Sequence, residues 1–298
     1  MLLESLDRHT ILHNLESRLL QVPLTYRLYA GRPAKISSVC DYVYRMWIRE
    51  SKQLPFNFFS NLLEGEERSV EKYGRKRMPL GYGFIEPFRT MVNHAIGMPL
   101  AAFSVLSVLG LDGTPIAGGA IELIQGRLFL AGEIEEGEEG VTSTLGDSSL
   151  YIYPSRRKTL DDEGVLIATN RHDPRFSKEW NGIDEALTQY FPKFVWSSYT
   201  GAYALVALSV GLVHGYIMLE EPGEYKLSVN AGLAFAKIAK CPVVVVKRDG
   251  TYVPYDPLPN GLPPGSEDKV EGILVAACNE GMLQSIIKEI IIKEVLQI

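Results

Sequence analysis

Histidine and carboxylate side chains stand at two places where their spacing could bind a metal ion. His9 and His13 are four residues apart, so a helix would place both imidazoles on one face. The stretch 133–139 is acidic and could attract Ca²⁺, but it lacks the spaced oxygen ligands of a calcium loop. We therefore interpret the histidines as an ordinary helix face and the acidic stretch as the solvated tip of a hairpin.

The common signatures of catalytic sites do not occur in the chain. It contains no GxxxxGK[ST] loop, no HExxH pair, no GxSxG turn and no GxGxxG after a strand. Two Asp-Gly-Thr triplets, at 112–114 and 249–251, each follow an apolar run that is typical of a strand. Because Asp-Gly favours tight turns, we interpret both triplets as hairpin corners rather than as catalytic motifs.

Residues 64–108 carry a more specific pattern. A Gly-Glu-Glu triplet is followed about twenty residues later by Glu-Pro, and then by an Asn, a Pro and a Ser in fixed order: Gly65-Glu66-Glu67, Glu86-Pro87, Asn93, Pro99 and Ser104. This segment resembles the core of the inositol monophosphatase and fructose-1,6-bisphosphatase superfamily, where a GEE motif precedes a DP(I/L)DGT motif. Weaker likenesses at 165–172, 201–216 and 231–232 extend the resemblance over almost the whole chain.

The resemblance implies a set of site residues. Enzymes of this superfamily hold Mg²⁺ through the GEE glutamate, both aspartates of the second motif and an Asp of a later WD motif, and the metals generate hydroxide. By this likeness, Glu66 and Glu86 would be metal ligands and catalytic residues, and Asp41 would correspond to an upstream Asp. The segment Arg89, Thr90 and Met91 would bind phosphate or another anion, at the start of a helix.

Several of these positions depart from the superfamily pattern. Arg89 stands where the metal-bridging Asp belongs, and Thr90 and Met91 replace Gly and Thr. The later Asp would fall between Lys226 and Asn230, yet no acidic residue occurs between Glu224 and Asp249. Exchanging a carboxylate for Arg changes the local charge by two units, and one unit pair at about 4 Å contributes roughly 4 kcal/mol at an effective dielectric near 20. The exchange therefore turns attraction for Mg²⁺ into repulsion.

Two functional hypotheses follow. The first is a degenerate homologue with little or no phosphatase activity, which needs no cofactor and binds a phosphorylated small molecule or inorganic anion, or assembles with an active paralogue. The second is an active phosphomonoesterase in which Glu66, Glu67, Glu86 and Asp41 hold Mg²⁺ in a rearranged site.

Arg89 has three interpretations. Its planar guanidinium suits phosphate. Alternatively, it pairs with neighbouring Glu86 and closes the site, or it is a surface residue at the start of a helix.

Composition sets the class of protein. Of 298 residues, 46% are hydrophobic and 22% are charged, which is typical of a soluble globular protein. Lys and Arg number 30 against 36 Asp and Glu, so no basic field for nucleic acid is expected. Three widely spaced cysteines and an N-terminus without signal-peptide features favour a reducing, cytoplasmic location.

The first half of the chain predicts helices followed by an antiparallel sheet. Residues 1–50 have helical apolar spacing, with a second helix over 41–49, and residues 51–82 are predicted to be polar and irregular. Three apolar runs then alternate with tight turns, which predicts an antiparallel meander with strands over 101–109, 116–123 and from 128.

The second half predicts alternating strands and helices. We expect strands at 165–168, 194–197, 215–219, 243–246 and 273–277, and helices at 176–190, 201–211, 226–239 and 280–296. The fold class is thus α/β (α+β), and the resemblance specifies a layered α/β/α/β/α sandwich with divisions 1–150 and 151–298. The resemblance also implies a homodimer.

One stretch requires a membrane check. Residues 195–219 contain no charged residue over 25 positions, which is long enough to span a bilayer. Gly201, Gly211 and Gly215 divide it, and it contains several serines and His214. We therefore predict a buried helix and a buried strand, and no association with a membrane.

Overall fold

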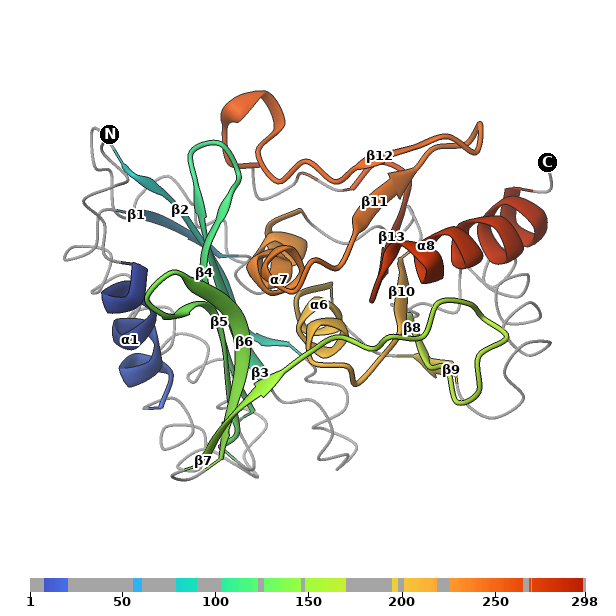
Figure 1. The fold of residues 1–298 in the computed structure, drawn as a ribbon. Helices are drawn as coiled ribbons and strands as arrows, with labels where there is room; N and C mark the ends of the chain where they lie inside the picture. Colours follow the sequence, from blue (N-terminus) through green and yellow to red (C-terminus); the bar gives the residue numbers. More distant parts are fainter. Residues whose placement is uncertain are drawn as a thin grey trace, which may run out of the picture.

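Two β-sheets and three layers of helices alternate in the computed structural model (Figure 1). The structure describes residues 8–20, 56–60, 79–89, 103–122, 126–145, 148–169, 195–197, 201–218, 226–264, 268 and 270–296. From one side to the other, the layers are α1, the first sheet, α6 with α7, the second sheet, and α8 with its continuation. The predicted α/β/α/β/α sandwich is confirmed.

Among the described residues, the first sheet has seven strands whose order in space equals their order in the chain. They are β1 (Phe56–Ser60), β2 (Gly81–Arg89), β3 (Phe103–Gly110), β4 (Pro115–Glu122), β5 (Leu128–Glu135), β6 (Glu138–Leu145) and β7 (Ser148–Ile152). Only the pair β1–β2 is parallel, and each later pair is antiparallel. The predicted meander is therefore confirmed, with more strands than expected.

Helix α1 (Arg8–Leu19) covers the outer face of this sheet. Its apolar residues Ile11, Leu12, Leu15 and Leu19 are buried against side chains of β1 to β5. On β3, Leu106 and Val108 belong to this outer core, whereas Val105 and Leu109 face the middle of the molecule. Strand side chains alternate between faces, so each residue of β3 can be assigned to one side.

In the part of the chain that the structure describes, the second sheet has six strands, in the order β12-β11-β13-β10-β8-β9. Their bounds are β8 (Ile167–Thr169), β9 (Val195–Ser197), β10 (Gly215–Met218), β11 (Val243–Val246), β12 (Tyr252–Pro254) and β13 (Ile273–Ala277). Strands β8, β9 and β10 are mutually parallel, while β13 runs antiparallel to β10 and β11. The central strands of this second sheet are apolar because helices cover both faces of the sheet.

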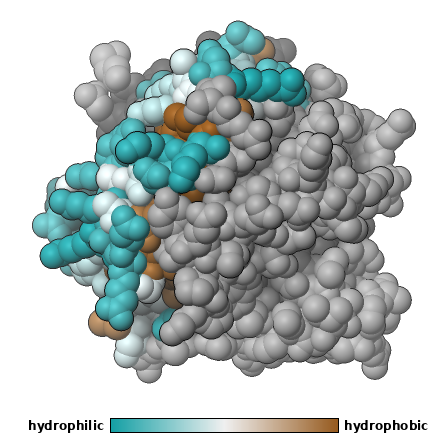
Figure 2. Space-filling view, turned by 90° about the vertical axis from the view of Figure 1, so that its right-hand side faces the viewer, coloured by the Kyte–Doolittle hydropathy of each residue, from teal (hydrophilic) through white to brown (hydrophobic). Residues whose placement is uncertain are grey.

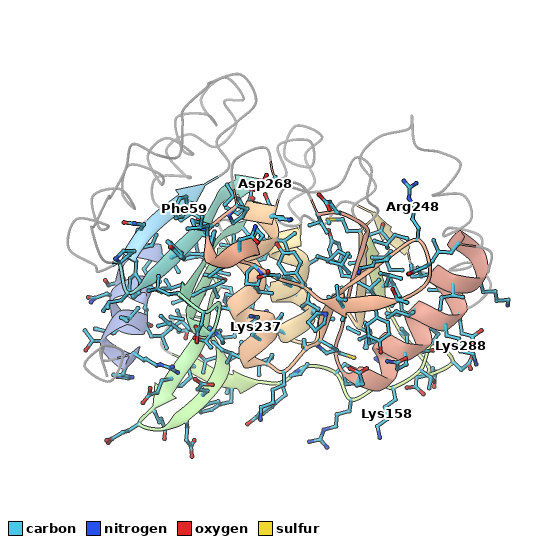
Figure 3. All side chains as sticks on the ribbon, turned by 90° about the horizontal axis from the view of Figure 1, so that it is seen from above. Phe59, Lys158, Lys237, Arg248, Asp268 and Lys288 are labelled. Carbon is cyan, nitrogen blue, oxygen red and sulfur yellow. The ribbon has the colours of Figure 1, made fainter. Side chains whose placement is uncertain are left out.

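Helices α6 (Gly201–Ser209) and α7 (Lys226–Ile238) form the layer between the sheets. Every residue of α6 and every residue of α7 from Leu227 to Ala236 is buried. The helices approach so closely that a Cβ on Gly232 would collide with the backbone carbonyl of Ala202. Figure 3 shows Lys237 in this middle layer, whereas Lys158 projects outward.

The last layer begins with α8 (Glu280–Ile286) and continues as the π-helical segment η6 (Ile287–Leu296). Asn279 caps α8 by accepting a hydrogen bond from the amide of Met282 at 3.1 Å. One face of this helical segment is apolar, and its five residues are all buried: Leu283, Ile286, Ile287, Ile290 and Ile291. A short 3-10 turn, η5 (Pro259–Gly261), lies in the loop before β13.

Some predictions require correction. The expectation that residues 51–82 are irregular is wrong, because β1 lies within them and β2 begins at Gly81. Phe56 and Phe58 are buried on one face of β1, but the polar residues around this short strand obscure it in the sequence. The interpretation of Arg89 as the start of a helix is also wrong, because Arg89 is the last residue of β2.

Other expected elements lie partly or wholly outside the described residues. The helices over 41–49 and 176–190 are among these. The stretch 195–219 contains β9, α6 and β10, as predicted, rather than one long helix. None of the helices in the described part of the chain is long and apolar enough to cross a membrane. Viewed from the side of α8, the described surface is mostly hydrophilic, with small hydrophobic areas (Figure 2).

Candidate functional site

Glu86 is the predicted site residue whose side chain the structure describes, and it lies near the end of β2. Its neighbour across the ladder is Val105 of β3, whose side chain belongs to the core between the two sheets. Directly paired residues point to the same face, so Glu86 points toward the middle helices. Its side chain is only 3% exposed. A buried carboxyl group requires hydrogen-bond donors or cations around it.

Ser228 of α7 supplies one such donor. Its hydroxyl donates a hydrogen bond to Oε2 of Glu86 at 2.6 Å, and Ser228 itself is 1% exposed. The superfamily likeness placed a metal-binding Asp somewhere from 226 to 230, with no fixed register. Within this segment, the structure shows the side chain of Ser228 bonded to Glu86.

Sequence reasoning did not single out Ser228. Its only signal was its position four residues before Gly232, the glycine at which α7 packs against α6. A fixed contact at Gly232 sets the rotation of α7, and residues four apart lie on neighbouring parts of a helix surface. That contact was not visible without the tertiary structure.

Hydrogen bonds from two directions hold the first half of α7 in place. Ser107 of β3 accepts from the amide of Ala234 at 3.0 Å and donates to the carbonyl of Ala231 at 2.7 Å. On another side, the hydroxyl of Tyr255 donates to Oδ1 of Asn230 at 2.9 Å, and Nδ2 of the Asn230 side chain donates to the carbonyl of Pro257 at 2.8 Å. These contacts position the helix that presents Ser228 to Glu86.

Tyr255 stays neutral in this network. Burial raises the pKa of its hydroxyl well above the usual value, and the nearby Asp256 carboxylate acts in the same direction. The hydroxyl thus remains a donor to Asn230 at any physiological pH. Ser107 and Ser228 thus form the polar contacts of α7 with β3 and β2, with Glu86 as their acidic member, whereas Asn230, Tyr255 and Pro257 form a separate set on another side of α7.

Arg89 lies three residues beyond Glu86, and a bulge separates them. Glu86 is opposite Val105, whereas Arg89 is opposite Phe103, so three steps on β2 match two steps on β3. Such a bulge changes the direction of the strand where pairing ends. The structure thus places the backbones of Glu86 and Arg89 close together on one strand. Glu66, Asp41, Thr90 and Met91 lie outside the described residues, as do Asn93 and Pro99.

Ser104, the last residue of the matched segment, does not join Glu86. It lies on β3 next to Val105, so its side chain points to the opposite, α1-facing side of the sheet. There it is 1% exposed, and its hydroxyl has no hydrogen-bond partner among the described residues. Spacing along the sequence placed Ser104 in the motif, but the alternation of the strand separates it from the candidate site.

The described residues do not assemble a set of metal ligands at Glu86. No group of three or more His, Cys, Asp or Glu side chains gathers in the described part of the chain. At Glu86, helix α7 contributes the neutral hydroxyl of Ser228, which donates a hydrogen bond to Oε2 of the carboxyl group. Mg²⁺ requires several oxygen ligands, with carboxylates to balance its charge. We derive no step through a metal from these residues.

The other sequence candidates are ordinary structure where they are described. Both Asp-Gly-Thr triplets are turns, between β3 and β4 and between β11 and β12. In each one, the Asp carboxylate accepts from the Thr amide and the Thr hydroxyl, through Asp112 and Thr114 or through Asp249 and Thr251. These hydrogen bonds lower the pKa of both aspartates. The interpretation of both as hairpin corners is confirmed.

The histidine pair lies on an ordinary helix face and the acidic stretch forms a hairpin tip, as predicted. His9 and His13 are exposed on α1, and Nδ1 of His13 contacts Glu16 at 3.3 Å. The acidic stretch forms the tip of the β5–β6 hairpin, where the carboxylate of Glu133 accepts from the amide of Gly137 at 3.0 Å.

Comparison with solved structures identifies the fold. Inositol monophosphatase from Anabaena is 16% identical, with a TM-score of 0.63 and 94% of each chain covered. The inositol monophosphatase of Thermotoga maritima is 15% identical, with a TM-score of 0.64, and covers 94% of this chain and 96% of its own. SuhB of Mycobacterium tuberculosis is 14% identical, with a TM-score of 0.62 over 95% of this chain and 97% of its own.

These likenesses concern the three-dimensional fold. No family model matches the sequence, and no curated protein matches it either. At such low identity, agreement over nearly the full length of both chains shows that this chain has the inositol monophosphatase fold. Activity must be argued from the residues at the site, because one fold can carry different functions.

Proposed function

We propose that this chain is a divergent relative of the inositol monophosphatase-type phosphatases that has little or no phosphatase activity and binds a phosphorylated small molecule or another anion. The fold supports the relationship, and the residues around Glu86 support the loss of turnover. The single observation that carries the proposal is the 2.6 Å hydrogen bond from Ser228 to the buried carboxyl group of Glu86.

This hydrogen bond stabilises the buried carboxyl group of Glu86, a role that a bound cation would otherwise have to fill. A buried carboxylate without a partner costs several kcal/mol, whereas a hydroxyl donor at 2.6 Å offsets part of that cost. A metal would have to compete with this donor and would gain no negative charge from Ser228. Glu86 therefore acts as a structural link between β2 and α7 rather than as a ligand of a catalytic metal.

Arg89 supports anion binding without turnover. It follows Glu86 on the same strand, in a protein whose fold is that of phosphatases. A guanidinium offers a planar set of donors that fits phosphate oxygens. It does not act as a Lewis acid and does not lose its proton near neutral pH, so it cannot generate hydroxide. Binding can thus persist after hydrolysis is lost.

A direct assay tests the absence of turnover. Purified protein is incubated with Mg²⁺ and a panel of inositol and sugar phosphates, and release of inorganic phosphate is measured with and without EDTA. We expect no release above the buffer rate, and calorimetry should detect no pair of Mg²⁺ sites tighter than ~100 µM. Release that EDTA abolishes and that Glu86→Gln abolishes as well would establish the alternative, an active metal-dependent phosphomonoesterase with rearranged ligands.

A second experiment tests anion binding. Thermal unfolding is followed in EDTA with increasing inorganic phosphate, for the wild type, Arg89→Ala and the control Arg156→Ala, which removes an exposed arginine outside the site. We expect phosphate to raise the unfolding temperature of the wild type and of Arg156→Ala, but not of Arg89→Ala. Equal shifts in all three proteins would show that Arg89 binds no anion.

A further inference from the structure

Two buried cysteines with free thiols, Cys241 and Cys278, stand at the same end of two paired strands in the second sheet. Cys241 lies two positions before β11, and Cys278 directly follows β13. The two strands are antiparallel, with Val243 opposite Ala276. When this register is continued by two positions beyond Val243, Cys241 stands directly opposite Cys278.

A hydrogen bond shows that the pairing does continue past the last residues of the two strands. The amide of Ala277 donates to the carbonyl of Pro242 at 3.1 Å, so these two residues form a hydrogen-bonded pair. Hydrogen-bonded and non-hydrogen-bonded pairs alternate along an antiparallel ladder, so Cys241 and Cys278 form a non-hydrogen-bonded pair. The Cα atoms of such a pair are about 4.5 Å apart. Disulfides join Cα atoms that are about 4.4–6.8 Å apart, so this position can accept one.

Main-chain hydrogen bonds hold both cysteines in place. The amide of Cys241 donates to the carbonyl of Ala236 in α7 at 2.8 Å, and the amide of Cys278 donates to the carbonyl of His214 at 3.0 Å. The thiol of Cys241 points toward its partner, because its Sγ lies 3.9 Å from the carbonyl oxygen of Cys278. Bringing the two sulfur atoms together therefore requires mainly side-chain rotation, with little movement of the backbone.

The two sulfur atoms have different surroundings. Sγ of Cys278 accepts from Nδ2 of Asn279 at 3.4 Å and donates to the carbonyl of Arg157 at 3.4 Å. Burial raises the pKa of Cys278 to about 11, although nearby amides and the charge of Arg157 act in the opposite direction. Burial, and next the nearby Cys278, raises the pKa of Cys241 to about 12. Because the thiolate is the reactive form, Cys278 is the first of the two to react with an oxidant.

We propose that Cys241 and Cys278 are a site of reversible oxidation, at which hydrogen peroxide forms a disulfide between the ends of β11 and β13. Sγ of Cys278 first attacks one oxygen of the peroxide, the O–O bond breaks, and a sulfenic acid and one water form. Sγ of Cys241 then attacks the sulfur of the sulfenic acid, the S–O bond breaks, and a second water leaves. Two thiols and one peroxide thus give one disulfide and two waters. A dithiol reductant reverses the change by thiol–disulfide exchange.

Burial makes this oxidation slow and restricts the oxidants that can carry it out. At pH 8 about one Cys278 side chain in a thousand is a thiolate. Cys241 is 4% exposed and Cys278 2%, which favours a small uncharged oxidant such as peroxide over a bulky disulfide. The pair therefore responds to sustained oxidation rather than to a brief exposure.

The disulfide connects the segments that join this sheet to two helix layers. Cys241 follows the end of α7, and Cys278 precedes Asn279, the residue that caps α8 (Figure 1). The bond also closes residues 241–278 into a loop, which restricts the unfolded chain. We expect the unfolding temperature of the oxidised protein to be about 5 °C higher than that of the reduced protein.

Mass spectrometry of the full chain tests the linkage. Reduced protein is incubated with hydrogen peroxide at pH 8, catalase removes the excess, and the remaining thiols are alkylated with iodoacetamide in urea. We expect neither Cys241 nor Cys278 to be alkylated, and digestion without reductant should yield a peptide pair joined through them. Dithiothreitol should restore alkylation of both. Alkylation of both after prolonged oxidation, a stable sulfinic acid at Cys278, or a disulfide that involves Cys40 would each overturn the proposal.

Three variants separate a disulfide of the folded protein from other oxidation. Cys241→Ala and Cys278→Ala each remove one thiol, and peroxide should not raise the unfolding temperature of either. Cys40→Ala keeps the pair and should show the full increase. The peptide mapping of the wild type needs neither variant, so it decides the linkage even if one of them fails to fold. A disulfide that forms only when peroxide is added in urea, or one that leaves the unfolding temperature unchanged or lower, would also overturn the proposal.

Discussion

Glu86 and Ser228 are 142 residues apart in the chain, yet their side chains meet at 2.6 Å inside the protein. One belongs to the first sheet and the other to the middle helix layer, so their hydrogen bond joins two layers. The opposing helix supplies a donor to this buried acidic residue, which offsets part of the cost of its burial. This contact therefore connects the stability of the fold with the chemistry of the candidate site.

Removing the hydroxyl of Ser228 should destabilise the protein. In Ser228→Ala, Glu86 keeps its burial but loses a short hydrogen bond, and we expect the free energy of unfolding to fall by about 1–3 kcal/mol. Urea denaturation measures this change. Ser209→Ala is the matched control, because the buried hydroxyl of Ser209 donates to the carbonyl of Leu205 in its own helix, a neutral acceptor. An equal loss in both variants would contradict a special role for the Glu86 contact.

The packing of α6 against α7 predicts a severe effect at Gly232. Alanine normally favours a helix over glycine by about 1 kcal/mol. At Gly232, however, the added Cβ would collide with the backbone carbonyl of Ala202, which cannot move like a flexible side chain. We expect Gly232→Ala to lower the free energy of unfolding by about 1–3 kcal/mol or more. An unchanged or increased stability in urea denaturation would show that the two helices are not in such close contact.

His214 should make stability depend on pH. Its Nδ1 lies 2.9 Å from the amide of Leu166 and its Nε2 lies 2.7 Å from Nη1 of Arg157. Burial lowers the pKa of His214, and the positive charge of Arg157 lowers it further. As the pH falls below about 6.5, the unfolded chain takes up a proton at this residue before the folded chain does. The free energy of unfolding should therefore fall with pH, down to the pKa of the folded state.

Substitution isolates the contribution of His214. Asn in its place cannot titrate but can still accept from the amide of Leu166, so the stability of His214→Asn should fall less steeply between pH 6.5 and the acid range. His13→Asn serves as the control, because the His13 side chain is 73% exposed. Parallel stability curves for the wild type and His214→Asn would contradict the expectation.

The thiols of Cys241 and Cys278 should resist alkylation in the folded protein. Both are buried and free, and burial raises the pKa of Cys241 to about 12 and that of Cys278 to about 11. At pH 8 almost none of either thiol is the reactive thiolate. Peptide mapping after brief iodoacetamide treatment should find both peptides unmodified, and both alkylated when urea is present. Equal labelling in native and unfolded protein would show that neither thiol is protected.

Apolar runs and turn residues predicted most of the second half of the chain. The runs at 243–246 and 273–277 are strands, and the helices over 201–211 and 226–239 are present to within two residues of their expected ends. Most residues of these elements are buried, so their sequences are rich in apolar residues, and their limits are marked by glycine and charged residues. The local pattern of apolar residues is therefore enough to predict secondary structure where an element is almost completely buried.

The first half was less predictable because its strands contain polar residues or lie near them. Strand β6 reads Glu-Glu-Gly-Val-Thr-Ser-Thr-Leu and forms through pairing with β5 rather than through its own hydrophobicity. Strand β2 carries Glu86 into the core and ends in Arg89. Such strands form because they pair with neighbours that are distant in sequence. The β-propensity of their own residues does not predict this pairing.

For the candidate site, the sequence determined which residues are present, including Glu86, Arg89 and the lack of a carboxylate from 226 to 230. Only the tertiary structure decided which of them meet. The side of β3 on which Ser104 lies and the rotation of α7 that turns Ser228 toward Glu86 depend on packing between layers. A one-residue change of register would send a strand side chain to the opposite face, so these contacts are set by the packed core and not by spacing along the chain.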